Sequence, residues 1–189
     1  MKGDTLILFA RAPRLGTVKR RLARETGDMA ALRFHRGQVA RLIRRLGHDR
    51  RWRFILAGTP DGARWHPGVA PHPQGRGDLG ERMARALGRH RRAVLIGSDI
   101  PALDATDIAA AFRALGRADA VFGPSEDGGY WLVGFGPRRP EAPFARVRWS
   151  SEHALADTLA NFSCHRVALL RRLRDVDTAS DLRELRRQR

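Results

Sequence analysis

One carboxylate follows a predicted buried strand in a position that suits metal chemistry. Asp99 comes shortly after the apolar run Ala93–Ile96, beside Ser98 and before Pro101, which sets a turn. Mg²⁺ and Mn²⁺ prefer hard oxygen ligands and take only one or two of them from a protein, so Asp99 is a candidate ligand. The structural alternative is that Asp99 caps the turn at Pro101.

Two further acidic segments have the same placement at the ends of predicted strands. Asp127 precedes Gly128 and Gly129, which allow a ligand to approach the backbone closely, although Asp-Gly is also a common hairpin signal. Asp175 and Asp177 come just before the last predicted helix. Three acidic segments at strand ends indicate a shared site more strongly than any one of them does.

The loop after the first predicted strand is cationic. It runs from Arg11 to Arg21, and Gly16 with the helix expected behind it would offer backbone N–H groups to phosphate, with Lys19 and Arg21 on the first turns. Its spacing matches neither a P-loop nor a dinucleotide-binding loop. An ordinary strand–turn–helix connection with solvated cations is the alternative. Combined with the acidic segments, the loop predicts a site for a metal-bound nucleoside diphosphate.

Strands and helices alternate along the chain. Continuous apolar runs predict buried strands over Thr5–Ala10, Arg53–Ala57, Ala93–Ile96, Ala120–Phe122, Tyr130–Val133 and His165–Leu170. Helices are expected with an apolar stripe from Met29 to Leu46 closed by Gly47, over Leu79–Leu87, from a cap at Asp104 to about Leu115, over Ser151–Phe162, and after Thr178. The pattern predicts an α/β, Rossmann-like three-layer αβα sandwich with a mostly parallel, mixed sheet. Ligands of such sheets bind outside the carboxyl ends of the strands.

The charge of the chain is large but ambiguous. Its 189 residues carry a formal net charge of +16, and only two of the 36 basic residues, Lys2 and Lys19, are lysines. The arginine excess indicates either a polyanionic partner or a GC-rich genome that writes arginine wherever a surface cation is needed. The arginines are spread over helix faces and no nucleic-acid motif is present, so a nucleic-acid partner is the distant alternative. Lys19 stands out, because a compact ammonium suits a phosphate contact.

Composition narrows the class of protein further. The hydrophobic fraction of 42% and the length predict one domain over residues 1–189, with no membrane span because no apolar run approaches ~20 residues. The single Cys164 excludes a disulfide framework and favours the cytoplasm. His66 and His72 lie in a proline-rich loop without a third ligand, so we expect no metal there.

Five blocks in order along the chain resemble a known family. They are Phe9–Pro13 with Gly16–Leu22, Gln74–Met83, Gly97–Leu103, Gly123–Gly134 and Asp175–Leu182, of which the second and fourth are specific. The family is the GT-A-type glycosyltransferases associated with arsenosugar biosynthesis, also called radical-SAM/selenodomain-associated transferases. The wider group to which this family belongs resembles the nucleotide-diphospho-sugar transferase superfamily, which includes guanylyltransferases. The resemblance implies a seven-stranded mixed sheet, a nucleotide donor and Mg²⁺ or Mn²⁺.

The resemblance also implies a role for each matching residue. It assigns catalysis to Lys19, Asp99 and Asp127, and the metal to Asp99 and Asp177. Donor and phosphate contacts fall to Arg11, Gly16, Lys19, Arg21, Gly77, Asp78, Gly80 and Ser98, and the acceptor side to Asp127, Gly128, Gly129 and Tyr130. The chain departs from the family pattern at Arg11, Arg20 and Ala179-Ser180, and the last departure bears on the geometry of Asp177.

Two chemistries fit this site. A glycosyltransferase would move a sugar from a nucleotide-diphospho-sugar to a small-molecule acceptor, and a nucleotidyltransferase would join a nucleoside triphosphate to a phosphorylated acceptor and release pyrophosphate. Both depend on electrostatic stabilisation of a departing phosphate. The cationic loop favours nucleotidyl transfer and the family resemblance favours glycosyl transfer, which we take as the prediction. A relative that only senses nucleotides is a further alternative, and the oligomeric state stays open.

Overall fold

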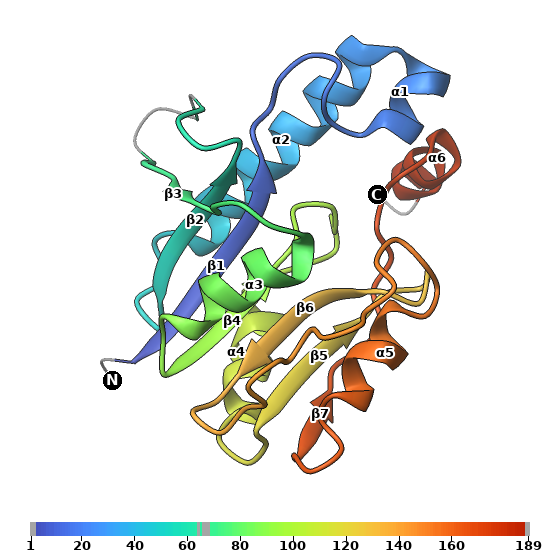
Figure 1. Ribbon diagram of the computed structural model, residues 1–189. Coiled ribbons are helices and arrows are strands. Elements are labelled where there is room, and N and C mark those ends of the chain that lie inside the picture. The colour runs from blue at the N-terminus through green and yellow to red at the C-terminus, as the bar shows by residue number, and fades with distance from the viewer. Residues whose placement is uncertain (1–2, 64, 66–68, 188–189) are drawn as a thin grey trace.

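A seven-stranded sheet organises the computed structural model, which describes residues 3–63, 65 and 69–187 (Figure 1). Its strands are β1 (Asp4–Arg11), β2 (Arg53–Thr59), β3 (His72–Pro73), β4 (Arg92–Ile96), β5 (Ala120–Pro124), β6 (Tyr130–Phe135) and β7 (Val167–Leu169). Their order in the sheet is β3-β2-β1-β4-β6-β5-β7. Only β6 runs antiparallel to its neighbours, so the predicted mostly parallel, mixed sheet is confirmed.

Helices cover both faces of this sheet. They are α1 (Arg20–Thr26), α2 (Asp28–Leu46), α3 (Leu79–Gly88), α4 (Ala105–Ala114), α5 (Ala154–Ala160) and α6 (Ala179–Arg187). Apolar residues of α2 and α4 share one core cluster with the sheet, and those of α3 and α5 share a second cluster on the opposite face. The three-layer αβα arrangement is therefore confirmed. Beyond the carboxyl end of β1, α1 and α6 lie side by side (Figure 1).

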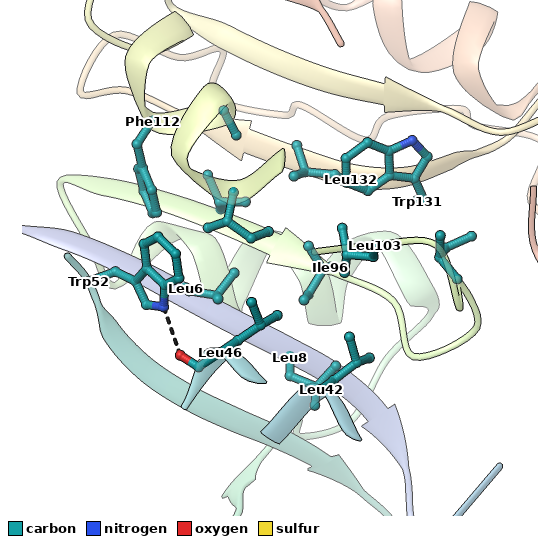
Figure 2. Packing of buried hydrophobic residues seen from close by; sticks show 14 of the residues in the cluster. Leu6, Leu8, Leu42, Leu46, Trp52, Ile96, Leu103, Phe112, Trp131 and Leu132 are labelled. Carbon is teal, nitrogen blue, oxygen red and sulfur yellow. Dashed lines mark hydrogen bonds between the residues drawn. The ribbon is translucent and has the colours of Figure 1, made fainter. Parts of the chain in front are cut away.

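Strand β1 shows why an unbroken apolar run forms a central strand. Leu6 and Leu8 point to the α2 and α4 side, while Ile7 points to the α3 side, and all three are at most 1% exposed. Figure 2 shows the first of these two layers, in which Trp52 packs against Phe112 of α4 and its Nε1 donates a hydrogen bond to the Leu46 carbonyl at 3.0 Å.

One expected core residue and two expected boundaries differ from the structure. Met29 is 53% exposed and does not join the apolar stripe of α2, because the first turn of that helix lies beside the loop at Gly16 rather than over the sheet. The helix expected over Ser151–Phe162 is limited to Ala154–Ala160 and is flanked by turns. Strand β7 is shorter than His165–Leu170, since its ladder with β5 spans three pairs.

Asp104 caps α4, as predicted, and the structure shows that the cap is a reciprocal capping box with Asp107. The Asp104 carboxylate accepts hydrogen bonds from the backbone N–H groups of Thr106 at 2.8 Å and Asp107 at 3.2 Å, and the Asp107 carboxylate accepts from the Asp104 N–H. This cap anchors the chain segment that follows β4.

We expect Asp104→Ala to lower the free energy of unfolding by about 1 kcal/mol, because two helical N–H groups lose their acceptor. In a chain of this size the melting temperature should fall by roughly 2–4 °C in a thermal denaturation experiment. Asp104→Asn keeps an acceptor oxygen and is the matched control. Equal losses in both variants would mean that the cap contributes nothing beyond charge.

Candidate functional site

The site lies where the order of the parallel strands reverses. Strands β1 and β4 are neighbours, and the chain leads from β1 outward to β2 and from β4 toward the other edge, so a crevice forms outside their carboxyl ends. A cavity of about 680 Å³ opens there. Of the predicted residues, the lining includes Arg11, Lys19, Ser98, Asp99, Asp127, Gly129, Tyr130 and Asp177.

The topology brings four distant chain segments to this edge. Because β6 is antiparallel, its first residues lie beside the end of β4, and the Gly97 N–H donates to the Trp131 carbonyl at 3.2 Å. The segment before α6 crosses the same edge, where the Leu173 N–H bonds to the Pro124 carbonyl and the Val176 N–H bonds to the Asp99 carbonyl, both at 3.1 Å. These backbone bonds fix the carboxylates of that segment beside the end of β4.

Lys19 is the cation at the centre of the site. Its Nζ lies 2.7 Å from Asp177 Oδ1, 3.0 Å from Asp99 Oδ1 and 2.7 Å from the Val176 carbonyl oxygen. Three acceptors thus surround an ammonium that has three N–H groups, and only 4% of the side chain is exposed. Burial by itself lowers the pKa of Lys19, but the charges of Asp99 and Asp177 outweigh it, so its pKa is raised above the usual value. Lys19 is therefore charged and fully paired.

The backbone around Lys19 differs from the expected helix start. Helix α1 begins at Arg20, after a turn at Gly16 with φ of 72°, and Lys19 itself has φ of 49° and ψ of 50°. The prediction that Lys19 occupies the first helical turn was wrong. A side chain in this left-handed conformation costs of order 1 kcal/mol or more, and the two ion pairs offset that cost.

Ser98 lies beside a carboxylate rather than standing free. It is 5% exposed, and its hydroxyl donates to Asp99 Oδ1 at 3.3 Å. Ser98 and Lys19 both contact the same oxygen of Asp99, Oδ1, so neither of them bonds to Asp99 Oδ2. In this arrangement Ser98 orients a candidate metal ligand.

Four carboxylates line the cavity together with the cations Arg11, Lys19, Arg20 and Arg82. Asp99, Asp127, Asp175 and Asp177 all line the cavity. Burial, followed by the charges of Asp127 and Asp177, raises the pKa of Asp175 to about 6. Sequence reasoning noticed Asp175 but gave it no role, since its environment depends on the turn of Asp127.

These residues fit a divalent cation that is bound jointly with a ligand. Among the described residues no three His, Cys, Asp or Glu side chains are close enough together to hold a metal ion by themselves. Mg²⁺ in nucleotide sites usually takes one or two carboxylates and completes its shell with phosphate and water. Asp99 and Asp177, whose carboxylates both lie beside Lys19 Nζ at the cavity, meet that requirement.

We expect Asp175→Asn to stabilise the metal-free protein at pH 7. An Asp whose pKa rises on folding contributes stability below its unfolded value near 4 and loses it as the pH rises through about 6. The rise corresponds to about 3 kcal/mol for a fully buried group, and screening of this partly exposed one reduces it to about 1 kcal/mol. In EDTA the variant should melt roughly 2–4 °C higher at pH 7 and gain little at pH 4. The exposed Glu141→Gln is the control, and an equal gain at both pH values would contradict the burial of charge at Asp175.

One wall of the cavity is aromatic and uncharged. Tyr130 and Trp149 meet with ring centroids 6.5 Å apart, and burial raises the pKa of Tyr130, so its hydroxyl stays protonated 3.4 Å from Thr158 Oγ1. Asp127 accepts from the Gly129 N–H at 2.9 Å and faces solvent beside this wall. Gly128 faces the other way: with φ of 82°, a Cβ added to it would lie 2.1 Å from the Glu152 carbonyl oxygen.

The donor contacts predicted after β3 are Gly77, Asp78 and Gly80, and two of them have structural interactions of their own. Asp78 caps α3 in a capping box with Glu81, and a Cβ on Gly80 would lie 3.0 Å from the Trp149 ring. Neither Gly77, Asp78 nor Gly80 lines the cavity, whereas Leu79, Arg82 and Met83 of α3 do. Of the three named residues Gly80 is buried, whereas Gly77 and Asp78 are exposed outside the lining.

Two residues of the cationic loop that were predicted to contact the donor do not line the cavity. Gly16 and Arg21 are outside its lining, while Arg11 and Arg20 belong to it. Arg21 is 69% exposed and reaches Asp177 Oδ2 only at 3.9 Å. Of the two loop histidines, His72 lies in β3 and is exposed, and His66 falls outside the described residues.

Sequence reasoning missed a buried polar pair at the ends of β1 and β2. His35 Nε2 is 2.8 Å from the Arg11 carbonyl oxygen, and Gln74 Nε2 donates to the Ala10 and Ala57 carbonyls. Arg82 completes the group by donating to Gln74 Oε1 at 2.9 Å. The signal for His35 was its polar character within the apolar stripe of α2.

Comparisons with known proteins agree with this fold. A protein of Desulfovibrio desulfuricans G20, provisionally assigned as a nucleotide-diphospho-sugar transferase, is similar over 100% of this chain and 88% of its own, with 29% identity and a TM-score of 0.91. Rv0371c of Mycobacterium tuberculosis H37Rv is similar over 97% of each chain, with 22% identity and a TM-score of 0.54. A second structure of Rv0371c, in complex with manganese, matches 97% of this chain and 98% of its own at 19% identity, with a TM-score of 0.51.

A synthetase also shares the fold. CMP:2-keto-3-deoxy-manno-octonic acid synthetase complexed with CTP is similar over 99% of this chain and 98% of its own, with 10% identity and a TM-score of 0.54. No curated protein sequence matches the chain. No described helix is long and apolar enough to cross a bilayer. A family model matches residues 16–151, and the chain belongs to that family, whose description is uncharacterized protein conserved in bacteria (DUF2064).

Proposed function

We propose that this chain is a metal-dependent glycosyltransferase that moves a sugar from a nucleotide-diphospho-sugar to a small-molecule acceptor. The observation that carries the proposal is the paired Lys19, Asp99 and Asp177 at the strand switch, in a cavity of about 680 Å³. A cavity of this size accommodates a nucleotide-sized ligand. The Desulfovibrio desulfuricans protein, similar over the whole chain, supports a transferase that uses such a donor.

Each part of the site would serve a separate need of this reaction. Asp99 and Asp177 would hold Mg²⁺ or Mn²⁺, which would neutralise the negative charge that develops on the leaving nucleoside diphosphate. Lys19, released from the carboxylates, would add positive charge at the same phosphates. Arg11 and Arg20 line the cavity and supply cations for the distal phosphate or the sugar side.

The aromatic wall would seat the acceptor. Tyr130 and Trp149 exclude water from one side of the cavity, and the protonated Tyr130 adds no charge there. Asp127, exposed beside this wall, is placed to accept the acceptor's proton as it attacks. The link to arsenosugar biosynthesis, the cytoplasmic location and the single-domain organisation stay predictions of this proposal.

Nucleotidyl transfer is the second candidate. The guanidinium groups of Arg11 and Arg20 stand at the cavity although Lys19 is already neutralised, which suits a triphosphate better than a diphosphate. The CMP:2-keto-3-deoxy-manno-octonic acid synthetase shows that the fold can hold CTP.

One experiment separates the two reactions. The protein is incubated with Mg²⁺ and separate panels of nucleoside triphosphates and nucleotide sugars, after a thermal-shift screen has ranked the donors. Release of nucleoside diphosphate from a nucleotide sugar, with water accepting the sugar because no acceptor is supplied, is the expected result. Release of pyrophosphate alone would overturn glycosyl transfer, and a lack of stabilisation by any nucleotide with or without metal would overturn the donor assignment.

A further inference from the structure

The Lys19 ammonium occupies the place that sequence reasoning reserved for a metal. Its Nζ is within 3.0 Å of one oxygen of each candidate ligand, Asp99 and Asp177, and the side chain is 96% buried between them. The second oxygen of each carboxylate belongs to the same cluster, which consists of Lys19, Asp99 and Asp177. A divalent cation bound there would therefore stand beside a buried ammonium of like charge.

The chain is built to hold Lys19 in this position. The loop ends in a left-handed backbone at Lys19 directly before α1, and the Val176 carbonyl supplies the third acceptor. The Val176 N–H is bound in turn to the Asp99 carbonyl, so the two carboxyl segments and the lysine form one closed unit. A fully paired ammonium has no N–H group left for a phosphate.

We infer that Lys19 excludes free divalent metal from Asp99 and Asp177, and that metal binds only together with the donor, whose phosphates receive the displaced ammonium. The inference rests on the proposed function, because the phosphates belong to the nucleotide donor. Binding is then obligatorily joint: the metal needs the phosphates to complete its shell, and Lys19 needs them to leave the carboxylates.

The test measures Mn²⁺ binding by electron paramagnetic resonance, without turnover. Wild type with Mn²⁺ alone should bind weakly, and Lys19→Met, which removes the charge but keeps the length of the side chain, should bind Mn²⁺ at least tenfold more tightly. Lys19→Arg keeps the charge and should still exclude the metal. Arg24→Met is the matched control, because Arg24 is an exposed cation of α1 outside the cavity lining. Adding Asp99→Asn to Lys19→Met should abolish the gained site.

The outcomes separate this inference from the proposed function. Tight binding of Mn²⁺ alone to wild type, or unchanged affinity in a folded Lys19→Met protein, would overturn exclusion by Lys19. A second series adds ADP, GDP, CDP or UDP to wild type, and one of them should raise its Mn²⁺ affinity. If none does while Lys19→Met binds Mn²⁺ alone, exclusion by Lys19 stands and the nucleotide donor is wrong. Thermal melting of each variant confirms that it is folded.

Discussion

Replacing Asp99 with alanine should reduce turnover by about 10³-fold and leave the fold intact. The Asp99 carboxylate is the candidate metal ligand at the end of β4, and losing a group that stabilises departing phosphate charge typically costs a factor of 10² to 10³. A metal contributes several kcal/mol of such stabilisation. The fold should survive, because the side chain is 43% exposed and the backbone bond from Val176 does not involve it.

The measurement compares the rate of nucleotide release from the identified donor in Asp99→Ala and in wild type, with circular dichroism and melting temperature as checks on folding. Asp49→Ala is the matched control. It removes a paired aspartate that precedes β2, toward the amino ends of the parallel strands and away from the site at their carboxyl ends, and should leave the rate unchanged. A rate within tenfold of wild type in a folded Asp99→Ala protein would show that the metal site lies elsewhere.

The layout of the fold could be predicted because most of it depends on local signals. Unbroken apolar runs such as Thr5–Ala10 occur in strands buried on both faces, and reciprocal caps such as Asp104 with Asp107 mark a helix start within four residues. The insertion of β6 between β4 and β5 carries no such signal. The local turn at Ser125–Gly129 pairs β5 with β6, but which of these two strands pairs with β4 is a tertiary outcome.

The members of the site were easier to predict than their partners. Asp99, Asp127 and Asp177 stood out because each is a carboxylate at a strand end. The pairing of Lys19 with Asp177 joins residues 158 positions apart, and nothing local reports it. Asp78 was predicted to contact the donor, but its carboxylate caps α3 and lies outside the cavity lining, and Arg82, which does line the cavity, carried no signal in the sequence.

The arginine excess acquires a partial explanation in the structure. Arg139 donates hydrogen bonds to the carbonyls of Leu87, His90 and Arg91, and Arg171 binds the buried Asp107 carboxylate through two nitrogens. Such contacts use the planar guanidinium group, which has several N–H donors, to provide hydrogen bonds to backbone carbonyls and to a buried carboxylate. Composition reports these arginines only as charge, so it could not separate structural cations from those at the site.

Replacing Lys19 with alanine should lower kcat by about 10²- to 10³-fold at saturating donor and metal. If Lys19 moves from the carboxylates to the donor's phosphates, its charge acts where negative charge grows as the leaving group departs, and that interaction is stronger in the transition state than in the ground state. The loss should therefore appear in kcat more than in KM. Arg24→Ala, in the same helix region but outside the cavity, should leave both constants unchanged.

The same variant would reveal whether one lysine has two opposing tasks. In Lys19→Ala the carboxylates of Asp99 and Asp177 have lost their ammonium partner, so the Mn²⁺ concentration that gives half the maximal rate should fall. The value of kcat should fall as well, although easier metal binding by itself would speed the reaction at limiting Mn²⁺. That opposition follows from one ammonium pairing with Asp99 and Asp177 before the donor binds and with phosphate afterwards. A lower kcat with unchanged Mn²⁺ dependence would mean that Lys19 contacts phosphate but does not exclude the metal. A change in KM alone would mean that Lys19 takes no part in the chemical step.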